Sequence, residues 1–283
     1  IIPDIDTTYN LGSSNKKWAN IHTNISNITN LTSNSFTAGG IEITQPQGNI
    51  FYVAKNGSDS NVGDHNLDPF LTISHALQAA DASTSGPVTI HISPGTYVET
   101  FPLTVPTNVT LQGHDMRNVI ITPNVSSQSN DAILLNGEST VENITIKDFY
   151  YNNGADTGYA FRFVSNATIS TRSPYIRNCT VITKGTTTSA SDPRGYASAD
   201  AGRGALIDGS VALQNSRSAS VLFHAVTFIT PGVTGLVAKS GVRVEWLNSF
   251  TYFAETGIKL EQGSGRTAPD GSTVYGCELR SIA

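Results

Sequence analysis

Charge, cysteine and long apolar runs are all scarce in this chain of 283 residues, and each scarcity excludes a class of protein. Charged residues make up only 14% of the sequence and the net charge is −5, which leaves no basic surface for nucleic acid. No apolar run approaches the ~20 residues of a membrane-spanning helix, so we expect no membrane insertion. No signal peptide is visible, so the sequence does not indicate export by the general secretory route.

Only two cysteines occur, Cys179 and Cys277, and their similar apolar surroundings suggest the same position in two structural repeats. With about two repeats between them, at ~4.8 Å for each strand, they would lie well beyond the ~7 Å limit of a disulfide. We therefore expect two free thiols that pack as small apolar side chains. Free thiols fit assembly in a reducing cytoplasm.

Recognisable cofactor motifs are also missing. The six histidines are scattered without zinc-site spacing, and no P-loop, dinucleotide-binding fingerprint or nucleophilic serine elbow occurs. We predict no cofactor, and calcium is the only metal for which weak ligand candidates exist. Asp59, Asp64 and Asp68 lie in one turn-rich segment but match no calcium motif, so a turn-forming role explains them better.

Short runs of alternating apolar and polar residues recur from about residue 50 onward, as expected for half-buried strands. Aligning the repeats on Ile144, Cys179 and Ala225 gives unequal spacings, which indicates a repeat fold whose turns carry loops of variable length. The clearest runs are Val88–Ile92, Val109–Gly113, Val141–Ile146, Ile176–Ile182 and Val221–Ile229.

One short amphipathic helix is predicted near the start of these repeats. Thr72 is a suitable N-cap, and the residues that follow place one apolar face on the helix, made of Ile73, Ala76, Leu77 and Ala80. Such a helix would cover the end of a stack of strands, which otherwise exposes unpaired edges and core side chains.

The segment from residue 51 to residue 97 resembles the first segment of right-handed parallel β-helix proteins of the pectin-lyase-like superfamily. This resemblance implies an all-β solenoid over residues 50–283 with a short N-terminal capping helix; the sequence ends inside an apparent repeat, so we expect the solenoid to be incomplete there. The fold alone does not determine a function. The matching residues are Tyr52, Val53, Asn56, Gly57, Ser58, Asp59, Gly63, Pro69, Phe70, Thr72, Ile73, Ala76, Pro94, Gly95, Thr96 and Tyr97.

Residues 1–23 contain a proline, then Tyr-x-Leu-Gly, then Trp-x-x-Ile. This pattern resembles a short element of bacteriophage tail fibres and other virion appendages. Residues 24–49 are expected to form a shaft or a linker, because apolar residues there recur at every third position; a short coiled coil and a flexible linker remain alternatives. A shaft or a coiled coil would need identical partner chains, so we expect a homotrimer. The residues that carry the tail-fibre resemblance are Pro3, Tyr9, Leu11, Gly12, Trp18 and Ile21.

Acidic residues that could act in glycoside or polysaccharide chemistry are scattered along the chain. Hydrolysis of a glycosidic bond needs two carboxylates roughly 5 to 9.5 Å apart, and no such pair stands out. The candidates are Asp192, Asp200, Asp208, Glu245 and Glu255.

Together these features predict a tail-associated virion protein, in the form of a tail fibre, tailspike or baseplate-linked protein, that is assembled in the host cytoplasm. Its expected role is structural and serves host attachment, with other tail or baseplate proteins and host surface polysaccharide as partners. The alternative is a depolymerase, either a glycoside hydrolase or a lyase, that acts on those glycans. We expect attachment without cleavage.

Overall fold

The computed structural model describes residues 36–38, 41–43, 49–83, 86–150, 155–163, 173–183, 201–211, 220–267 and 271–282. The chain divides into two compact units, Ile1–Gln47 and Gly48–Ala283. In the first unit, β1 (Phe36–Ala38) pairs antiparallel with β2 (Ile41–Ile43). The expected tail-fibre element at residues 1–23, and most of the expected shaft, lie outside the described residues.

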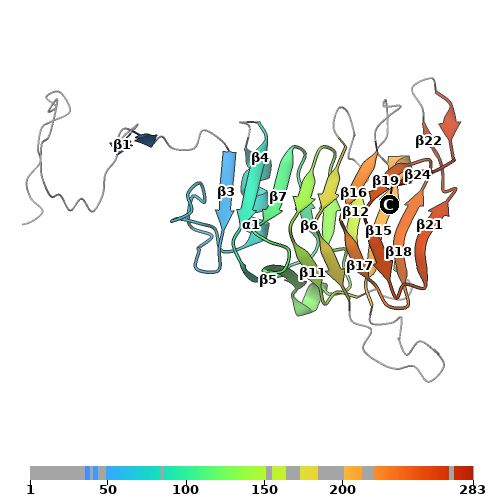
Figure 1. Cartoon of the computed structure of the whole chain (residues 1–283), viewed down its shortest axis with the longest axis horizontal. Helices are drawn as coiled ribbons and strands as arrows, with labels where there is room; N and C mark the ends of the chain where they lie inside the picture. Colours follow the sequence, from blue (N-terminus) through green and yellow to red (C-terminus); the bar gives the residue numbers. More distant parts are fainter. Residues whose placement is uncertain are drawn as a thin grey trace, which may run out of the picture. The chain divides into compact units, whose positions relative to one another are not determined.

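Three parallel sheets make up the second unit (Figure 1). Sheet 1 contains β3 (Asn49–Val53), β4 (Val88–Ile92), β7 (Val109–Gly113), β10 (Thr140–Glu142), β13 (Tyr175–Arg177), β16 (Val221–His224), β19 (Arg243–Leu247) and β24 (Glu278–Ile282). Sheet 2 contains β5 (Gly95–Glu99), β8 (Val119–Pro123), β11 (Thr145–Lys147), β14 (Thr180–Ile182), β17 (Thr227–Ile229) and β20 (Phe250–Tyr252). Sheet 3 contains β6 (Leu103–Val105), β9 (Ile133–Leu135), β12 (Tyr159–Phe163), β15 (Arg203–Asp208), β18 (Thr234–Lys239) and β21 (Thr256–Glu261).

Each turn of the chain visits sheets 1, 2 and 3 in that order and adds one strand to each. Every strand therefore pairs with the equivalent strand of the turn before it, as β10 does with β7 and β11 does with β8. Connections between parallel strands take the right hand. The second unit is thus a right-handed parallel β-helix, which confirms the fold predicted from the sequence. A small antiparallel pair, β22 (Arg266–Thr267) and β23 (Thr273–Val274), precedes β24.

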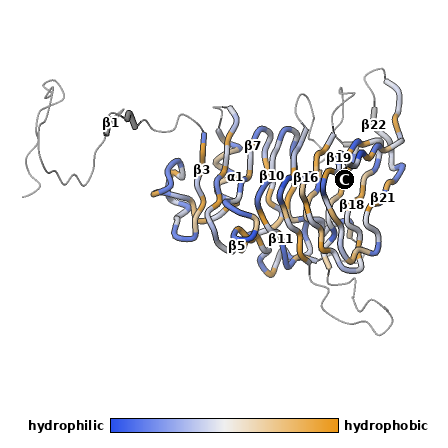
Figure 2. Tube along the Cα trace, in the orientation of Figure 1, coloured by the Kyte–Doolittle hydropathy of each residue, from blue (hydrophilic) through white to orange (hydrophobic). Residues whose placement is uncertain are grey.

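Alternation of side chains separates the core from the surface. In β4, Val88, Ile90 and Ile92 are buried while Thr89 and His91 are not, and burial alternates in the same way in β7, β8 and β19. Apolar and polar residues follow one another closely along the tube in Figure 2. The core of the later turns contains packed aromatic rings, with Phe223 and Trp246 having ring centroids 5.4 Å apart. Because every turn contributes to one continuous core, burial of these side chains stabilises neighbouring turns together.

The corner between sheets 1 and 2 is a short connector whose first residue has a left-handed backbone. The φ angles of Asn143, Asn178, Ala225 and Asn248 are 58°, 50°, 54° and 46°. Asn adopts this conformation more readily than other non-glycine residues. Asn178 Nδ2 also donates to Asn143 Oδ1 over 3.3 Å, so successive corners are linked. Ala225 occupies the one corner of these four without an Asn side chain.

This corner corrects the sequence alignment of the repeats by one residue. Thr145 pairs with Thr180, and Thr180 pairs with Thr227, so the residue equivalent to Cys179 is Val226 and not Ala225. The error arose because both residues are small and apolar, whereas the backbone places the left-handed corner at Ala225.

The two cysteines do not occupy equivalent positions, contrary to the sequence prediction. Cys179 lies at the corner between sheets 1 and 2, whereas Cys277 directly precedes β24 at a different corner. Both are free, with Cys179 buried and Cys277 half-buried. Burial raises the pKa of the Cys179 thiol to about 12.

The predicted helix is α1 (Ile73–Ala82), and its four expected apolar residues are buried. Thr72 is the N-cap, and its hydroxyl accepts from the backbone N of His75 over 3.2 Å. The buried Glu99, at the end of β5, accepts from the backbone N atoms of Ile73 and Ser74. Burial raises the pKa of this carboxyl, although those two hydrogen bonds oppose the shift. Within the described residues no helix is long and apolar enough to cross a membrane.

Candidate functional site

A row of polar and aromatic side chains crosses the outer face of sheet 1. Strand register places these residues directly opposite one another on six successive strands, from β3 to β16. Their neighbours along each strand face the core, so the row faces outward. We call this the sheet 1 row, and it consists of Tyr52, His91, Gln112, Glu142, Arg177 and His224.

Glu142 is the centre of the row, and it is only 2% exposed although it lies on the outer face. Gln112 Nε2 donates to Glu142 Oε1 over 2.5 Å, and Arg177 Nε donates to Glu142 Oε2. The hydrogen bond to Glu142 raises the pKa of the Arg177 guanidinium. A carboxylate withdrawn from water needs such partners, so the arginine and the amide hold it in place.

Aromatic and imidazole rings flank the centre towards the N-terminal end of the solenoid. His91 Nδ1 lies 3.5 Å from Gln112 Oε1. The His91 ring packs edge-on against Tyr52, with centroids 6.0 Å apart, and against His114, with centroids 5.9 Å apart. These contacts fix the orientation of His91 at the surface.

The other flank contains a tyrosine and a histidine. Arg177 lies over the Tyr175 ring, 5.6 Å from its centroid. The Tyr175 hydroxyl and His224 Nδ1 are 3.2 Å apart, and the two rings are stacked with an interplanar angle of 13°. Hydrogen-bonding groups and ring faces therefore run without interruption from β3 to β16.

The row spans five strand spacings of about 4.8 Å, or about 24 Å, which suits an extended ligand. Among the strand residues of sheet 1, the next carboxylate along this face is Glu245, on β19. Three strand spacings separate β10 from β19, and Glu245 is offset by two residues along the strand from the position in register with Glu142. The backbones of Glu142 and Glu245 are therefore about 16 Å apart, whereas the carboxylates of a glycosidase pair are roughly 5 to 9.5 Å apart. Glu245 is moreover paired with Arg243 Nη2 at 2.8 Å.

The structure does not gather the acidic candidates predicted from the sequence. Asp192 and Asp200 lie outside the described residues. Glu245 is on sheet 1, while Asp208 ends β15 of sheet 3 and Glu255 directly precedes β21 of the same sheet. None of these three described candidates belongs to the sheet 1 row.

Asp208 has a structural explanation. Its carboxylate lies 3.3 Å from Lys239 Nζ and accepts from the backbone N and the hydroxyl of Ser210. Burial alone would raise the pKa of Asp208, but the hydrogen bonds from Ser210 outweigh it, and the net shift is downward. This residue holds the turn that follows β15.

The candidate calcium ligands lie in the loop before α1, where Asp59 and Asp68 accept hydrogen bonds from its backbone. Asp59 accepts from the backbone N atoms of Leu71 and Thr72 and from the Thr72 hydroxyl. These hydrogen bonds lower the pKa of Asp59 despite the opposing effect of burial. Asp68 accepts from the backbone of Val62, and Asp64 is exposed. In the described ranges no three His, Cys, Asp or Glu residues form a group that could hold a metal.

A second charged group lies beside sheet 3. Arg162 bridges Asp131 at 2.8 Å and Asp156 at 2.6 Å. Arg203 stacks on the Tyr159 ring, 4.1 Å from its centroid, and donates to the Tyr159 hydroxyl. Burial raises the pKa of Tyr159 to about 12. The group links β12 and β15 to each other and to the loops before β9 and β12, which is a structural role.

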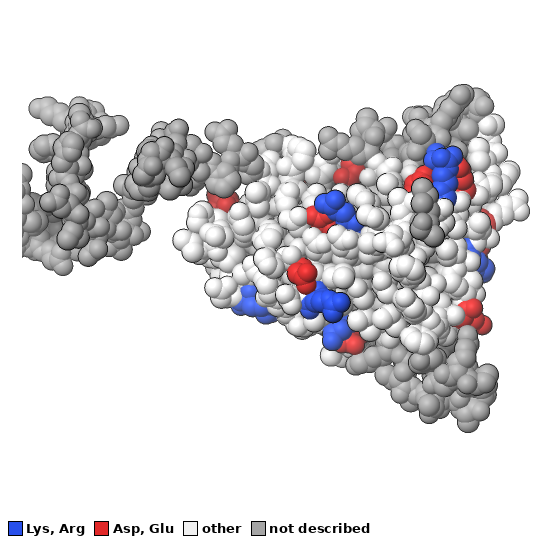
Figure 3. All heavy atoms as spheres, viewed as in Figure 1, with Lys and Arg blue, Asp and Glu red and all other residues white. Residues whose placement is uncertain are grey.

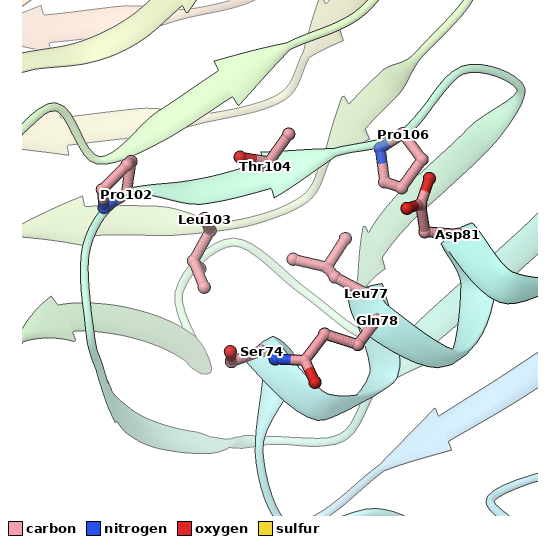
Figure 4. A pocket seen from close by; sticks show the side chains of 8 residues that line it. All are labelled: Ser74, Leu77, Gln78, Asp81, Pro102, Leu103, Thr104 and Pro106. Atoms are coloured by element: carbon pink, nitrogen blue, oxygen red, sulfur yellow. The ribbon is translucent and has the colours of Figure 1, made fainter.

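Two hollows lie away from the row. One of about 230 Å³ separates α1 from the start of sheet 3, with Leu77 and Leu103 facing each other across it and Asp81 as its one acidic residue (Figure 4). The other, of about 340 Å³, lies beside β21 and is lined by Leu260, Tyr275 and Cys277. The first lining contains one titratable side chain, Asp81. The second also includes Glu261, whose carboxylate is paired with Lys259 Nζ at 2.6 Å.

Sequence reasoning missed the centre of the row, although a signal for it existed. Glu142 and Arg177 each directly precede an Asn-x-Thr sequence, which begins at Asn143 and at Asn178. Those Asn residues form the left-handed corners, so the residue before each one ends a sheet 1 strand and faces outward.

These features define the molecule as a right-handed parallel β-helix protein with a polar row on one outer face. The chain belongs to the family described as "Protein of unknown function (DUF1565)", whose model matches residues 55–221, more than half of the sequence. No curated protein matches the sequence.

Solved structures with a similar fold include pectin methylesterases and a rhamnogalacturonan lyase. A pectin methylesterase in complex with a hexasaccharide has 15% identity and a TM-score of 0.40, over 74% of this chain and 66% of its own. A rhamnogalacturonan lyase has 16% identity and a TM-score of 0.49, over 83% and 68%. Pectin methylesterase PemA from Erwinia chrysanthemi has 12% identity and a TM-score of 0.38, over 82% and 92%. The chain spans about two thirds of the first two, and likeness at this level concerns the fold and not the chemistry.

Proposed function

We propose that this protein is a subunit of a bacteriophage tail appendage whose sheet 1 row binds host surface polysaccharide without cleaving it. The observation that carries the binding proposal is the unbroken register of Tyr52, Gln112, Glu142, Arg177 and His224 across successive strands. The virion context rests on the resemblance of residues 1–23 to tail-fibre elements. Both parts are open to test.

The chemistry of the row suits a sugar polymer. Hydroxyl groups of sugars exchange hydrogen bonds with amide, carboxylate and guanidinium groups, and aromatic rings offer apolar faces against which a sugar ring can pack. A length of about 24 Å allows several sugar units to bind at once. Several weak contacts along one chain then add up to useful affinity.

Cleavage is not favoured by this geometry. Gln112 and Arg177 already engage both oxygens of Glu142, and the next strand carboxylate on the face is too distant for a hydrolytic pair. The alternative function is a glycoside hydrolase or a lyase. One observation favours it, namely that a carboxylate withdrawn from water beside an arginine also occurs in catalytic sites.

Binding and product formation on the same polysaccharides decide between these functions. The full chain is titrated by calorimetry with neutral and acidic bacterial surface polysaccharides, and reducing ends and unsaturated products are assayed in parallel. We expect binding without product, and weaker binding in Glu142→Gln and Arg177→Gln. Glu278→Gln, at an exposed ion pair with Arg280 outside the row, is the matched control. Product that disappears in Glu142→Gln would establish the depolymerase, and no binding to any polysaccharide would refute both functions.

The proposed protein acts as a homotrimer together with other tail or baseplate proteins, and it resides in the virion tail after assembly in the host cytoplasm. The first of these statements is tested by light scattering on the full chain. Three chains per particle are expected, and a monomer at micromolar concentration would contradict the prediction.

A further inference from the structure

The outer face of sheet 2 differs from the other two faces in having almost no charge. One row of outward residues along it reads Lys147, Ile182, Ile229 and Tyr252, in register on β11, β14, β17 and β20. The row beside it consists of threonines on β11, β14 and β17 and ends at Phe250. Lys147 is the one charged residue at the outward positions of these strands, and Asp148 lies 3.9 Å from it.

Large apolar side chains are exposed at one end of this face. Phe250, Tyr252 and Phe253 are 51%, 48% and 57% exposed, and their rings contact one another with centroids 6.2 and 6.4 Å apart. Ile182 is also exposed. Contiguous exposed apolar surface of this kind marks a site of interaction in a soluble protein.

The composition of the face favours a protein partner over a sugar. Apart from Lys147, the outward strand residues provide threonine hydroxyls and apolar groups, and none of the amide or carboxylate groups that orient sugars. The core of a protein interface, by contrast, is depleted in charged residues and enriched in aromatic ones.

The near absence of charge on the outer face of sheet 2 makes it suitable for contact with a second copy of the same chain. When identical chains pack side by side and parallel about a common axis, each strand meets the same strand of its neighbour, and like charges meet like. Sheet 1 would bring the ion pairs Arg177–Glu142 and Arg243–Glu245 against their own copies, and sheet 3 would do the same with Lys239–Asp208 and Lys259–Glu261. The outward strand residues of sheet 2 would bring only one such pair together, Lys147 with Asp148, so this face places the least charge in the interface. Figure 3, in the view of Figure 1, shows charged side chains gathered in small groups of both signs.

We propose that the outer face of sheet 2 is the surface through which identical chains of this protein pack, parallel and in register. The inference rests on the homotrimer of the proposed function and adds the surface, the orientation and the register. It does not depend on polysaccharide binding, because the sheet 1 row lies on a different face and stays accessible.

Sedimentation of the full chain tests the surface. Wild type is expected to be an oligomer at micromolar concentration, and Ile229→Lys and Tyr252→Lys are expected to be monomers with unchanged circular dichroism. Tyr275→Lys is the matched control, since Tyr275 is 47% exposed and lies outside sheet 2. Folded Ile229→Lys and Tyr252→Lys variants that remain oligomeric would overturn the proposal, and so would a monomeric wild type.

A charge-swap experiment tests the register. Ile229→Lys and Ile229→Glu chains should each be monomeric alone and should associate when mixed, because the same position of each chain meets in a parallel assembly. Failure of the mixture to associate would refute the parallel register. Polysaccharide titration of the monomeric variants distinguishes chain packing from glycan binding at this face. Unchanged affinity per chain supports the proposal, and lost affinity would identify the outer face of sheet 2 as a glycan-binding surface instead.

Discussion

Sheets 1 and 2 share the same turns of the chain and the same core, yet their outer faces have opposite chemistry. Within one turn, β13 presents Arg177 beside the buried Glu142, while β14 presents Ile182 to solvent. Only Asn178 and Cys179 separate the two strands. The comparison shows that adjacent faces of a β-helix can differ in chemistry, because outward side chains are free of the packing constraints inside.

The inward side chains of the two sheets do not differ in this way. Val141 and Ile176 of sheet 1 are fully buried apolar residues, and so are Ile146 and Val181 of sheet 2. The inward residues of both sheets are therefore alike, and the contrast between the two sheets lies in their outward side chains. Four predictions test this contrast, in order of decreasing expected effect.

The largest difference between the two faces is expected in stability, when Arg177 of sheet 1 is compared with Ile182 of sheet 2. Arg177→Ala leaves the buried Glu142 without its cationic partner and should lower the free energy of unfolding by about 1 to 3 kcal/mol, less than for a fully buried pair because Arg177 is 44% exposed. Ile182→Ala, in the same turn, should cost less than about 1 kcal/mol, as surface substitutions do. Urea unfolding measures both, and equal losses would mean that the carboxylate does not depend on Arg177.

The second largest difference is expected in polysaccharide binding, which should depend on sheet 1 and not on sheet 2. Glu142→Gln removes the charge but keeps the shape, and it should weaken polysaccharide binding about tenfold, or about 1.4 kcal/mol. Thr227→Val on sheet 2 preserves shape in the same way and should leave binding unchanged. Calorimetric titration measures both affinities, and a comparable loss in Thr227→Val would move the binding surface to sheet 2.

The corner that joins the two faces offers a gain in stability. Ala225→Asn places a residue that tolerates a left-handed backbone between Asn178 and Asn248, and it should raise the free energy of unfolding by about 0.5 to 1 kcal/mol. The reciprocal change, Asn178→Ala, should lower it by a similar amount. Thermal and urea unfolding check both, and a destabilised Ala225→Asn would show that the corner has no room for the amide.

The smallest effect is expected for the Cys179 thiol, which lies at the corner between sheets 1 and 2. Because burial raises the Cys179 pKa to about 12, the folded protein should resist alkylation there at neutral pH, while the half-buried Cys277 reacts faster. The folded pKa exceeds the unfolded one, so the contribution of this thiol to stability is lost as the pH rises towards 12. Mass mapping of iodoacetamide adducts and alkaline unfolding of Cys179→Ala test this, and rapid labelling of Cys179 would show that water enters the corner.

Much of the solenoid could be predicted from the sequence, because alternation and the Thr72 cap are local signals. The sheet 1 row could not, because it depends on which strands lie side by side. A shift of one residue, as between Ala225 and Val226, exchanges inward for outward positions. Glu142 and Gln112 are far apart in sequence, and they lie side by side only because the loops between their strands have particular lengths. Those loops differ in length from turn to turn, so the pairing cannot be read from a regular repeat. Of the acidic candidates predicted from the sequence, the three that the structure describes, Asp208, Glu245 and Glu255, lie outside the row.

Unequal connector lengths have a consequence for evolution and for engineering. The connectors from sheet 1 to sheet 2 are as short as Asn143–Ile144, whereas residues 183–202 separate β14 from β15 between sheets 2 and 3. An inserted sequence at Asn143 would shift two sheets against each other, but the connectors beyond sheet 2 already vary from turn to turn without disturbing the register. New peptides should therefore be accepted beyond sheet 2, where such a protein can diversify or carry a grafted epitope while the outer faces of sheets 1 and 2 stay the same.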